Sequence, residues 1–513
     1  MADVELTVIG ETRAVETAYG QVRGTRDGSV ASFRGIPFAG SCAGFARFRP
    51  PRPPAAWTGV RDAVVFADAC PQLPQMPEWN IPVAAWNLRA GSSEDCLHLN
   101  VWTPDVAGAS RPVFVWIHGG GMEFGAGSQA WFDGARLAAR ADAVVVTINY
   151  RLGALGWLYL GDEEESEPVL GNAGLHDQIL ALRWVNENIA AFGGDPERVT
   201  VGGRSAGAIT VNSLLAAPEA AGLFSQAAVM SGAAETDSPA QATAFTETLF
   251  HELGLEWAER SKLWHLAAAD LVGATRRALA HKPVDIHRSV ARCLPLVGGV
   301  TLPRPPHEAV AYGSCRDVTL LITSTAHEGG LAPLVLAGEG DDAVVRKLVE
   351  AVAELDEGAA RKIVASYREL GGDWDRSTLY HQIATEMRLG VPSQRLAEAQ
   401  VGAGGTAYLG VFAHRSPVRE KGAFHGIDVG FIFDTLDLPG MAELSGSGPN
   451  VRALRDAVME SWTAFLWRGD PSCDAIAWST FSRERPEPML IDVTSHHAPA
   501  ELGEARKAWN GVL

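Results

Sequence analysis

The sequence lacks the features that would place it in a membrane or on a nucleic acid. Hydrophobic residues make up 47% of its 513 positions, yet no apolar run is long enough for a transmembrane helix. Basic residues (43) are fewer than acidic residues (61), and the net charge of −18 disfavours nucleic acid or an anionic membrane surface as a partner. The composition predicts an ordinary soluble globular protein.

Cysteine is scarce as well, and the common metal-binding patterns are absent. Six cysteines in so long a chain do not form a disulfide scaffold, and neither Cys-x-x-Cys nor His-Glu-x-x-His occurs, so we predict no metal site. Cys70 and Cys96 are either a disulfide that closes a loop or two buried thiols. Residues 1–8 have neither the basic nor the apolar segment of a secretory signal, so we expect a cytoplasmic protein.

Short β-type runs alternate with longer helical patterns along the chain. The runs are nearly continuous in Val, Ile and Leu, which is typical of parallel strands buried on both faces. Helical periodicity is clear at 175–190 and 451–467. We predict an α/β fold in which helices cover both faces of a central, mostly parallel sheet. The predicted strands are 113–117, 143–148, 199–201, 227–230, 318–322, 407–412 and 489–493.

Two helix-rich stretches lie between the predicted strands. They run from about 235 to 310 and from about 335 to 400, and no internal repeat is present. We interpret them as helical insertions that roof the sheet. The chain is therefore predicted to form a single domain, residues 1–513.

The most informative motif is Gly203-Arg204-Ser205-Ala206-Gly207. It follows a β-type run and opens a helical run, which is the setting of the strained turn that exposes a nucleophilic serine. The two glycines supply the room that backbone and substrate need at such a turn. The N-terminus of the following helix stabilises negative charge that develops beside the serine. The motif therefore predicts Ser205 as a nucleophile.

A nucleophilic serine needs a base that removes its proton and an acid that orients the base. Candidates for both lie downstream in the expected order, Glu328 after one predicted strand and His425 after the next. Because the carboxyl ends of parallel strands meet at one edge of a sheet, we expect the three side chains to converge. His327, beside Glu328, is interpreted as a surface loop residue and not as the base.

A glycine loop follows the first predicted strand. Residues 118–121 read His-Gly-Gly-Gly, and glycines let two backbone N–H groups face a developing oxyanion. The N–H of Ala206, directly after the serine, would be a third donor. His118 is interpreted as a residue that shapes the loop.

Several further segments carry a resemblance to a known family. They lie at 33–39, 57–63, 93–101, 149–156, 171–178 and 192–196. In this order they resemble the type-B carboxylesterase family, which includes para-nitrobenzyl esterases, mammalian carboxylesterases and cholinesterases. The resemblance implies an α/β-hydrolase fold whose helical insertions roof an active-site gorge.

The resemblance also implies roles for individual residues. The catalytic triad that it implies is Ser205, Glu328 and His425. The oxyanion donors that it implies are Gly120, Gly121 and Ala206. It further implies a structural salt bridge between Arg47 and Glu94, and it matches Cys70 and Cys96 with the first disulfide of the family.

The chain departs from the family beside the nucleophile. The family usually has Glu where this sequence has Arg204. Asp428 stands where the family carries an acid that shares a buried network with that Glu. We predict an ion pair between Arg204 and Asp428. The alternative is that Arg204 attracts substrates that carry a carboxylate.

Apolar residues near these motifs are predicted to bind the substrate. Trp86, with Trp79, is interpreted as an apolar wall and not as a quaternary-ammonium site, because Leu331 replaces a second aromatic. Met122 and Phe124 follow the glycine loop and are predicted to line the same pocket.

Together these features predict a serine carboxylesterase that hydrolyses small-molecule esters through an acyl-enzyme, without a metal or organic cofactor. A carbamate or amide hydrolase with the same triad is one alternative. A non-catalytic binding protein of the same fold is another, but such proteins typically lose a triad residue, and all three are present here. Both a monomer and a homodimer are compatible with the sequence.

Overall fold

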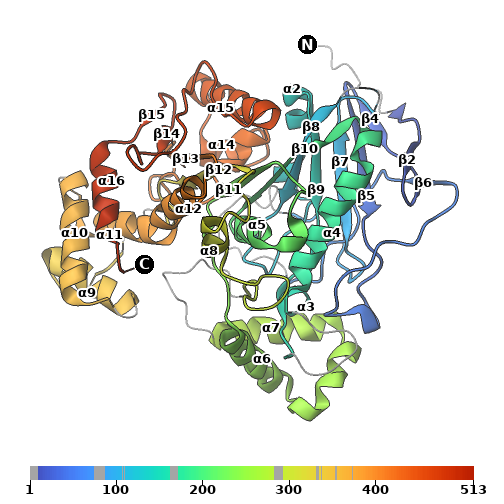
Figure 1. Ribbon diagram of the computed structural model, residues 1–513, viewed down its shortest axis with the longest axis horizontal. Coiled ribbons are helices and arrows are strands. Elements are labelled where there is room, and N and C mark those ends of the chain that lie inside the picture. The colour runs from blue at the N-terminus through green and yellow to red at the C-terminus, as the bar shows by residue number, and fades with distance from the viewer. Residues whose placement is uncertain are drawn as a thin grey trace.

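The computed structural model describes residues 10–73, 87–106, 108, 110–161, 171–281, 293–330, 334–336, 338–352, 355–371 and 374–512. A large sheet runs through the middle of the molecule, with helices beside it and two further groups of helices at its edges (Figure 1). Among the described residues, no helix is long and apolar enough to cross a membrane.

The main sheet of the described residues has twelve strands in the order β1-β4-β5-β7-β9-β8-β10-β11-β12-β13-β14-β15. The strands from β9 to β14 in this order pair in parallel, which confirms the predicted mostly parallel sheet. The outer strands pair antiparallel. The bounds are β1 Gly10–Glu11, β4 Thr25–Asp27, β5 Val30–Pro37, β7 His98–Thr103, β8 Arg111–Ile117, β9 Val144–Ile148, β10 Gly194–Arg204, β11 Gln226–Met230, β12 Thr319–Thr325, β13 Ala407–Phe412, β14 Met489–Ile491 and β15 His496–His497. A smaller sheet contains β2 Val15–Thr17, β3 Gly20–Arg23 and β6 Val60–Asp62.

Strand β8 shows why helices are needed on both sides of the sheet. Successive side chains of a strand point to opposite faces. Val113, Val115 and Ile117 pack into one hydrophobic core, whereas Phe114 and Trp116 pack into a second core. Because both sets are large and apolar, each face must be covered.

Two sets of helices provide this cover. Helices α4, α5, α8 and α12 contribute to the first core, and α2, α13 and α15 contribute to the second. The helices predicted at 175–190 and 451–467 are confirmed as α4 and α15, with ends shifted by one or two residues. The bounds are α2 Ala135–Ala141, α4 Ala173–Asn188, α5 Ala206–Ala216, α8 Pro306–Ala311, α12 Val391–Gly402, α13 Val429–Ile432 and α15 Pro449–Arg468.

Further helices occupy the two predicted insertions. Helices α6 and α7 pack together at one edge of the molecule, and α9, α10 and α11 gather with the C-terminal helix α16 at another (Figure 1). The second group has its own core, which includes Tyr367 and Trp509. That these helices roof an active site within one domain stays a prediction. The bounds are α6 Pro239–Leu253, α7 Ala268–His281, α9 Gly340–Ala351, α10 Glu357–Gly371, α11 Arg376–Thr385 and α16 Ala500–Lys507, with a π-helix at Glu386–Gly390 between α11 and α12.

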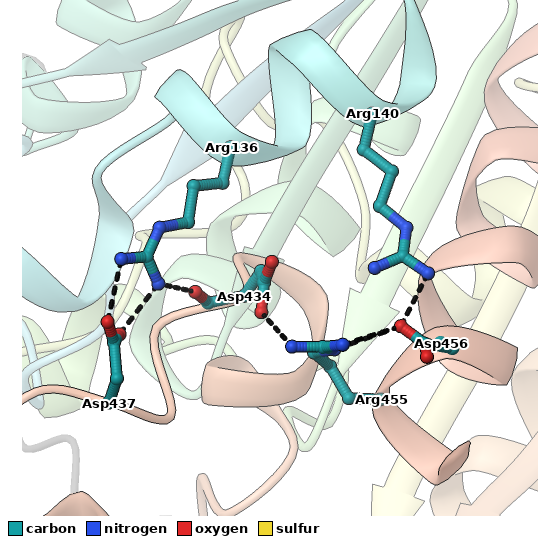
Figure 2. Close-up of polar contacts among 6 residues, drawn as sticks. All are labelled: Arg136, Arg140, Asp434, Asp437, Arg455 and Asp456. Carbon is teal, nitrogen blue, oxygen red and sulfur yellow. Dashed lines mark hydrogen bonds and ion pairs between the residues drawn. The ribbon is translucent and has the colours of Figure 1, made fainter. Parts of the chain in front are cut away.

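An ion-pair network ties α2 to α15 and to the segment that follows α13 (Figure 2). Arg136 on α2 contacts both carboxylate oxygens of Asp437, at 2.6 and 2.7 Å. Arg455 on α15 contacts Asp434 at 3.0 Å. The network therefore anchors the chain directly after α13. Its members are Arg136, Arg140, Asp434, Asp437, Arg455 and Asp456.

Candidate active site

Ser205 lies on the turn between β10 and α5. The strand ends at Arg204, and the helix begins at Ala206. Ser205 has φ 58° and ψ −124°, which is a strained conformation for any residue with a Cβ atom. Its N–H donates to the carbonyl of Met230 on β11 at 2.9 Å, which holds the turn against the sheet. The predicted strained turn is therefore present.

Two glycines allow the chain to turn here. A Cβ atom on Gly203 would lie 2.6 Å from the carbonyl carbon of Gly207. A Cβ atom on Gly207 would lie 2.1 Å from the carbonyl oxygen of Ile117 on β8. Both distances are far below van der Waals contact, so a larger residue at either position would displace the turn.

The glycine loop lies directly against the serine. A Cβ atom on Gly119 would lie 3.2 Å from the Cβ of Ser205. Gly120 and Gly121 have φ values of 118° and 63°, which residues with side chains rarely adopt. Among the hydrogen bonds of the described residues, none has the N–H of Gly120, Gly121 or Ala206 as its donor. Unpaired backbone donors beside a serine are what an oxyanion hole requires.

His118 supports this loop from behind. Its Nδ1 lies 2.8 Å from the carbonyl oxygen of Gly119, and its ring stacks on Tyr150 with the centroids 4.5 Å apart. The Tyr150 hydroxyl donates to the His118 carbonyl at 2.8 Å. Burial lowers the pKa of His118 to about 4, so the ring is neutral. These contacts agree with the predicted shaping role.

Glu328 and His425 form a close pair. Glu328 follows β12, and His425 lies between β13 and α13. Oε2 of Glu328 is 2.5 Å from Nδ1 of His425. The Glu328 side chain is 1% exposed and the His425 side chain 22% exposed. Because Nδ1 is engaged with the carboxylate, Nε2 is the ring nitrogen left to accept a proton.

Burial and neighbouring charges set the protonation state of this pair. Burial would raise the pKa of Glu328, but the charge and hydrogen bond of His425 lower it below its usual value. Burial lowers the pKa of His425, and the charges of Arg204 and Arg388 lower it further. The pair is therefore a carboxylate and a neutral imidazole at neutral pH, and a neutral imidazole can act as a general base.

Three residues that the sequence analysis missed hold Glu328 in place. The Ser231 hydroxyl and the Thr325 N–H both donate to Oε1, at 2.8 and 2.6 Å. The Glu328 N–H donates to Oγ1 of Thr385 at 3.3 Å. Ser231 has φ 48° and directly follows β11. Its place at the carboxyl end of a buried strand is the sequence signal that could have found it.

The nucleophile and the base are not hydrogen-bonded in this structure. Within the described part of the chain, the His425 side chain bonds only to Glu328. Such serine–histidine bonds often tighten only when substrate is bound. Ser205 is 8% exposed, so a small part of it is open to a ligand.

His327 joins the loop of Glu328 to the loop of His425. Its Nδ1 accepts the N–H of Ala423 at 3.0 Å, and its own N–H donates to the Ala423 carbonyl at 3.0 Å. Burial and the charge of Arg415 lower the pKa of His327 to about 4. His327 is thus a half-buried loop residue that connects the two loops.

Arg204 does not form the predicted ion pair with Asp428. Both residues are 3% exposed, yet no N–O contact within 4.0 Å joins them, and Nε of Arg204 and Oδ1 of Asp428 have no partner among the described residues. The guanidinium packs instead against Gly426, where a Cβ atom would be 2.4 Å from Cζ, and lies 5.7 Å from the centre of the Trp131 ring. The charges interact only at longer range: burial raises the pKa of Asp428 to about 6, and Arg204 opposes that rise.

The predicted pocket walls are only partly described. Phe124 is half-buried, and its ring lies beside Gly120, where a Cβ atom would be 2.9 Å from Cδ2. Met122 is fully buried in the first core. This burial does not support the predicted contact of Met122 with the substrate, which stays a prediction. The other predicted wall residues lie outside the described residues: Trp79, Trp86 and Leu331.

Two pairs implied by the family resemblance have different outcomes. The Arg47–Glu94 salt bridge is confirmed, because Nε of Arg47 donates to Glu94 at 2.8 Å. Cys70 and Cys96 are free, buried thiols in this structure and not a disulfide. The Cys70 sulfur instead accepts the N–H of Leu152 at 3.3 Å.

Comparison with known proteins identifies the family of this chain. The model of the carboxylesterase family matches residues 11–508. The para-nitrobenzyl esterase of Bacillus subtilis (strain 168) is 35% identical over 489 residues, which cover 93% of this chain and 94% of that protein. The crystal structure of a Geobacillus stearothermophilus carboxylesterase aligns with a TM-score of 0.84 at 34% identity, covering 97% of this chain and 100% of that chain. A structure of a PNB esterase also aligns with a TM-score of 0.84, at 31% identity over 96% of this chain and 99% of that chain. The chain therefore belongs to the carboxylesterase family and has the α/β-hydrolase fold.

Proposed function

We propose that this protein is a serine carboxylesterase whose catalytic triad is Ser205, Glu328 and His425. Its family and its esterase relatives support hydrolysis of carboxylic esters. The assignment of residues depends on one observation above all, the 2.5 Å contact between Glu328 and His425. This pair and the strained Ser205 turn both follow parallel strands of one sheet, which is where α/β enzymes bind their ligands.

The reaction proceeds in two halves. His425 Nε2 takes the proton of Ser205 Oγ as the oxygen attacks the ester carbonyl, and Glu328 stabilises the imidazolium that forms. The tetrahedral intermediate collapses to an acyl-enzyme, and the alcohol leaves with the proton from His425. Water then attacks the acyl group through the same base, which releases the acid and restores the Ser205 hydroxyl.

The negative oxygen of the intermediate is held by backbone donors. We assign this role to the N–H groups of Gly120, Gly121 and Ala206, which donate to no other group within the described part of the chain. Loss of one such donor lowers turnover by roughly 10²–10³ in other enzymes. No metal or organic cofactor is needed in this scheme.

The substrate is proposed to contact residues around the glycine loop and the serine. Phe124 is the best placed of them, because it is half-buried beside Gly120. Arg204 is proposed to bind the substrate because it precedes the nucleophile and has no ion-pair partner among the described residues. Trp86, Met122 and Leu331 are also proposed to contact the substrate, on the basis of their positions in the chain alone.

Turnover of p-nitrophenyl esters of increasing acyl length tests the proposal, with Ser205→Ala as the matched variant. The wild type should release a burst of p-nitrophenol followed by steady turnover, and Ser205→Ala should show neither. A folded wild type that hydrolyses no member of the series would overturn the proposal. Corresponding anilides and carbamates show whether the same triad also acts on those bonds.

The proposed setting is a cytoplasmic enzyme that acts on small-molecule esters as a monomer or homodimer. Six free cysteines support a reducing compartment, because disulfides form and persist mainly in oxidising ones. Size-exclusion chromatography with light scattering distinguishes the two assembly states.

A further inference from the structure

Two arginines near the triad have no hydrogen-bond or ion-pair partner among the described residues. Arg204 directly precedes the nucleophile, and Arg388 lies on the π-helix that begins next to Thr385, whose hydroxyl binds the Glu328 N–H. Nε of each arginine is buried without a hydrogen-bond partner, and within the described residues neither guanidinium forms an ion pair. Burying an unpaired charge is unfavourable by several kcal/mol in general, so a negatively charged ligand that pairs with these groups would be stabilised.

Neither carboxylate of the site is in direct contact with these guanidinium groups. Glu328 is engaged with His425 at 2.5 Å. Asp428, whose pKa burial raises to about 6, is still mostly a carboxylate at neutral pH, but it acts on Arg204 only at longer range. The charges of Arg204 and Arg388 both act on His425. The two guanidinium groups therefore lie near the catalytic base without a carboxylate in direct contact among the described residues, in a protein whose net charge is −18.

The two guanidinium groups oppose the hydrolysis of a neutral ester. When Ser205 loses its proton, His425 becomes an imidazolium, and two nearby cations destabilise that positive charge. A negative group on the substrate would offset them. The same two cations then favour the transition state of an anionic ester over that of a neutral one.

We propose that Arg204 and Arg388 form a carboxylate-binding subsite, and that the preferred substrates are esters with a free carboxylate near the scissile bond, such as monoesters of dicarboxylic acids. Guanidinium groups bind carboxylates through paired N–H···O bonds, which gives direction as well as charge. The subsite rests on the proposed serine esterase activity and adds the substrate class to it.

Matched ester pairs test the subsite. The monoethyl esters of succinic, glutaric and adipic acid are compared with the corresponding ester amides, in which –CONH2 replaces the carboxylate. Ethanol release gives kcat and KM for wild type, Arg204→Gln and Arg388→Gln. Arg183→Gln on α4, which removes a surface arginine paired with Glu219, controls for total charge.

The wild type should favour the carboxylate of at least one pair by about tenfold or more, the range expected for a hydrogen bond to a charged group. Each glutamine variant should move the ratio towards one, mainly through KM, and Arg183→Gln should leave it unchanged. Raising the salt concentration should raise KM for the carboxylate esters alone, which tests the wild type without any substitution.

The outcomes separate the two proposals. The subsite is overturned if kcat/KM is equal for ester acids and ester amides and if neither variant nor salt changes this ratio. That result would not contradict the proposed esterase activity. Absence of turnover for these esters and for p-nitrophenyl esters in a folded wild type overturns the esterase itself. Arg204→Lys and Arg388→Lys retain the charge and should keep part of the preference for carboxylate esters. If the arginines had a purely structural role, this preference would not depend on the charge of the replacement residue.

Discussion

Nδ1 of His327 accepts the backbone N–H of Ala423 at 3.0 Å, and the His327 N–H donates back to the Ala423 carbonyl at the same distance. These two bonds connect the residue before Glu328 to a residue just before His425. The 2.5 Å contact between acid and base depends on how the two loops lie relative to one another. His327 is therefore in a position to set that relationship.

Replacing His327 by Leu should lower kcat by about tenfold with little change in KM. The leucine leaves the Ala423 N–H without an acceptor, and a small displacement of the His425 loop is enough to impair proton transfer. His327→Asn offers an oxygen acceptor and should restore most of the activity. Steady-state kinetics and thermal unfolding of both variants measure the effect. If His327→Leu keeps the wild-type kcat, or if His327→Asn is equally impaired, the connecting role is wrong.

The pH dependence of kcat/KM should report the depressed pKa of His425. Burial, Arg204 and Arg388 lower this pKa, and Glu328 opposes them, so the midpoint of the acid limb should lie below the usual histidine value of about 6.5. Activity should rise with pH as the imidazolium loses its proton and stay high through neutrality. Arg204→Gln removes one cation and should move the midpoint to higher pH.

Profiles of a neutral ester between about pH 4.5 and 9 measure this limb. Asp428 titrates in the same window, because burial raises its pKa to about 6, so Asp428→Asn serves as the control that removes the second titration. A wild-type midpoint above the usual histidine value would contradict the argument, as would a shift to lower pH in Arg204→Gln.

The stability of the helical group formed by α9, α10, α11 and α16 should depend on a buried ion pair. Nε of Arg506 contacts Oε2 of Glu386 at 2.6 Å, and both side chains are at most 5% exposed. Arg506→Met leaves the carboxylate buried without its partner, which should lower the free energy of unfolding by about 3–5 kcal/mol. The double variant Arg506→Met/Glu386→Leu removes both charges and should recover much of the loss. Urea unfolding measures both, and a loss below about 1 kcal/mol in the single variant would show that the pair matters little.

All six cysteines should titrate as free thiols once the protein is unfolded without reductant. In the folded protein most should react slowly, because five of them are buried and burial raises the pKa of a thiol such as Cys42. Ellman titration before and after denaturation measures this difference. A deficit of two thiols that is absent in Cys70→Ser/Cys96→Ser would instead show the disulfide of the family.

The nucleophile and the strand pattern could be predicted from the sequence because both are local. The runs in β8 and β9 are almost entirely apolar, with Arg111 and Thr147 as the exceptions. The Gly-x-Ser-x-Gly motif indicates a tight turn, since only glycine fits where Gly203, Gly207 and Ile117 meet. Glu328 and His425 followed from chain order and family resemblance. Their mutual distance did not, because it depends on how two loops nearly a hundred residues apart pack together.

The tertiary structure decided the polar contacts around the triad. Ser231, Thr385 and His327 carry no motif. Ser231 and Thr385 contact Glu328, and His327 contacts Ala423, only because the tertiary fold brings the end of β11, helix α11 and the loops after β12 and β13 together. The Arg204–Asp428 pair was expected from charge and chain position, but Gly426 leaves room for the guanidinium to lie elsewhere. A sequence specifies which residues can ionise or bond, and periodicity shows which faces are apolar. Whether two charges a few ångströms apart meet is decided by the packing of the side chains between them.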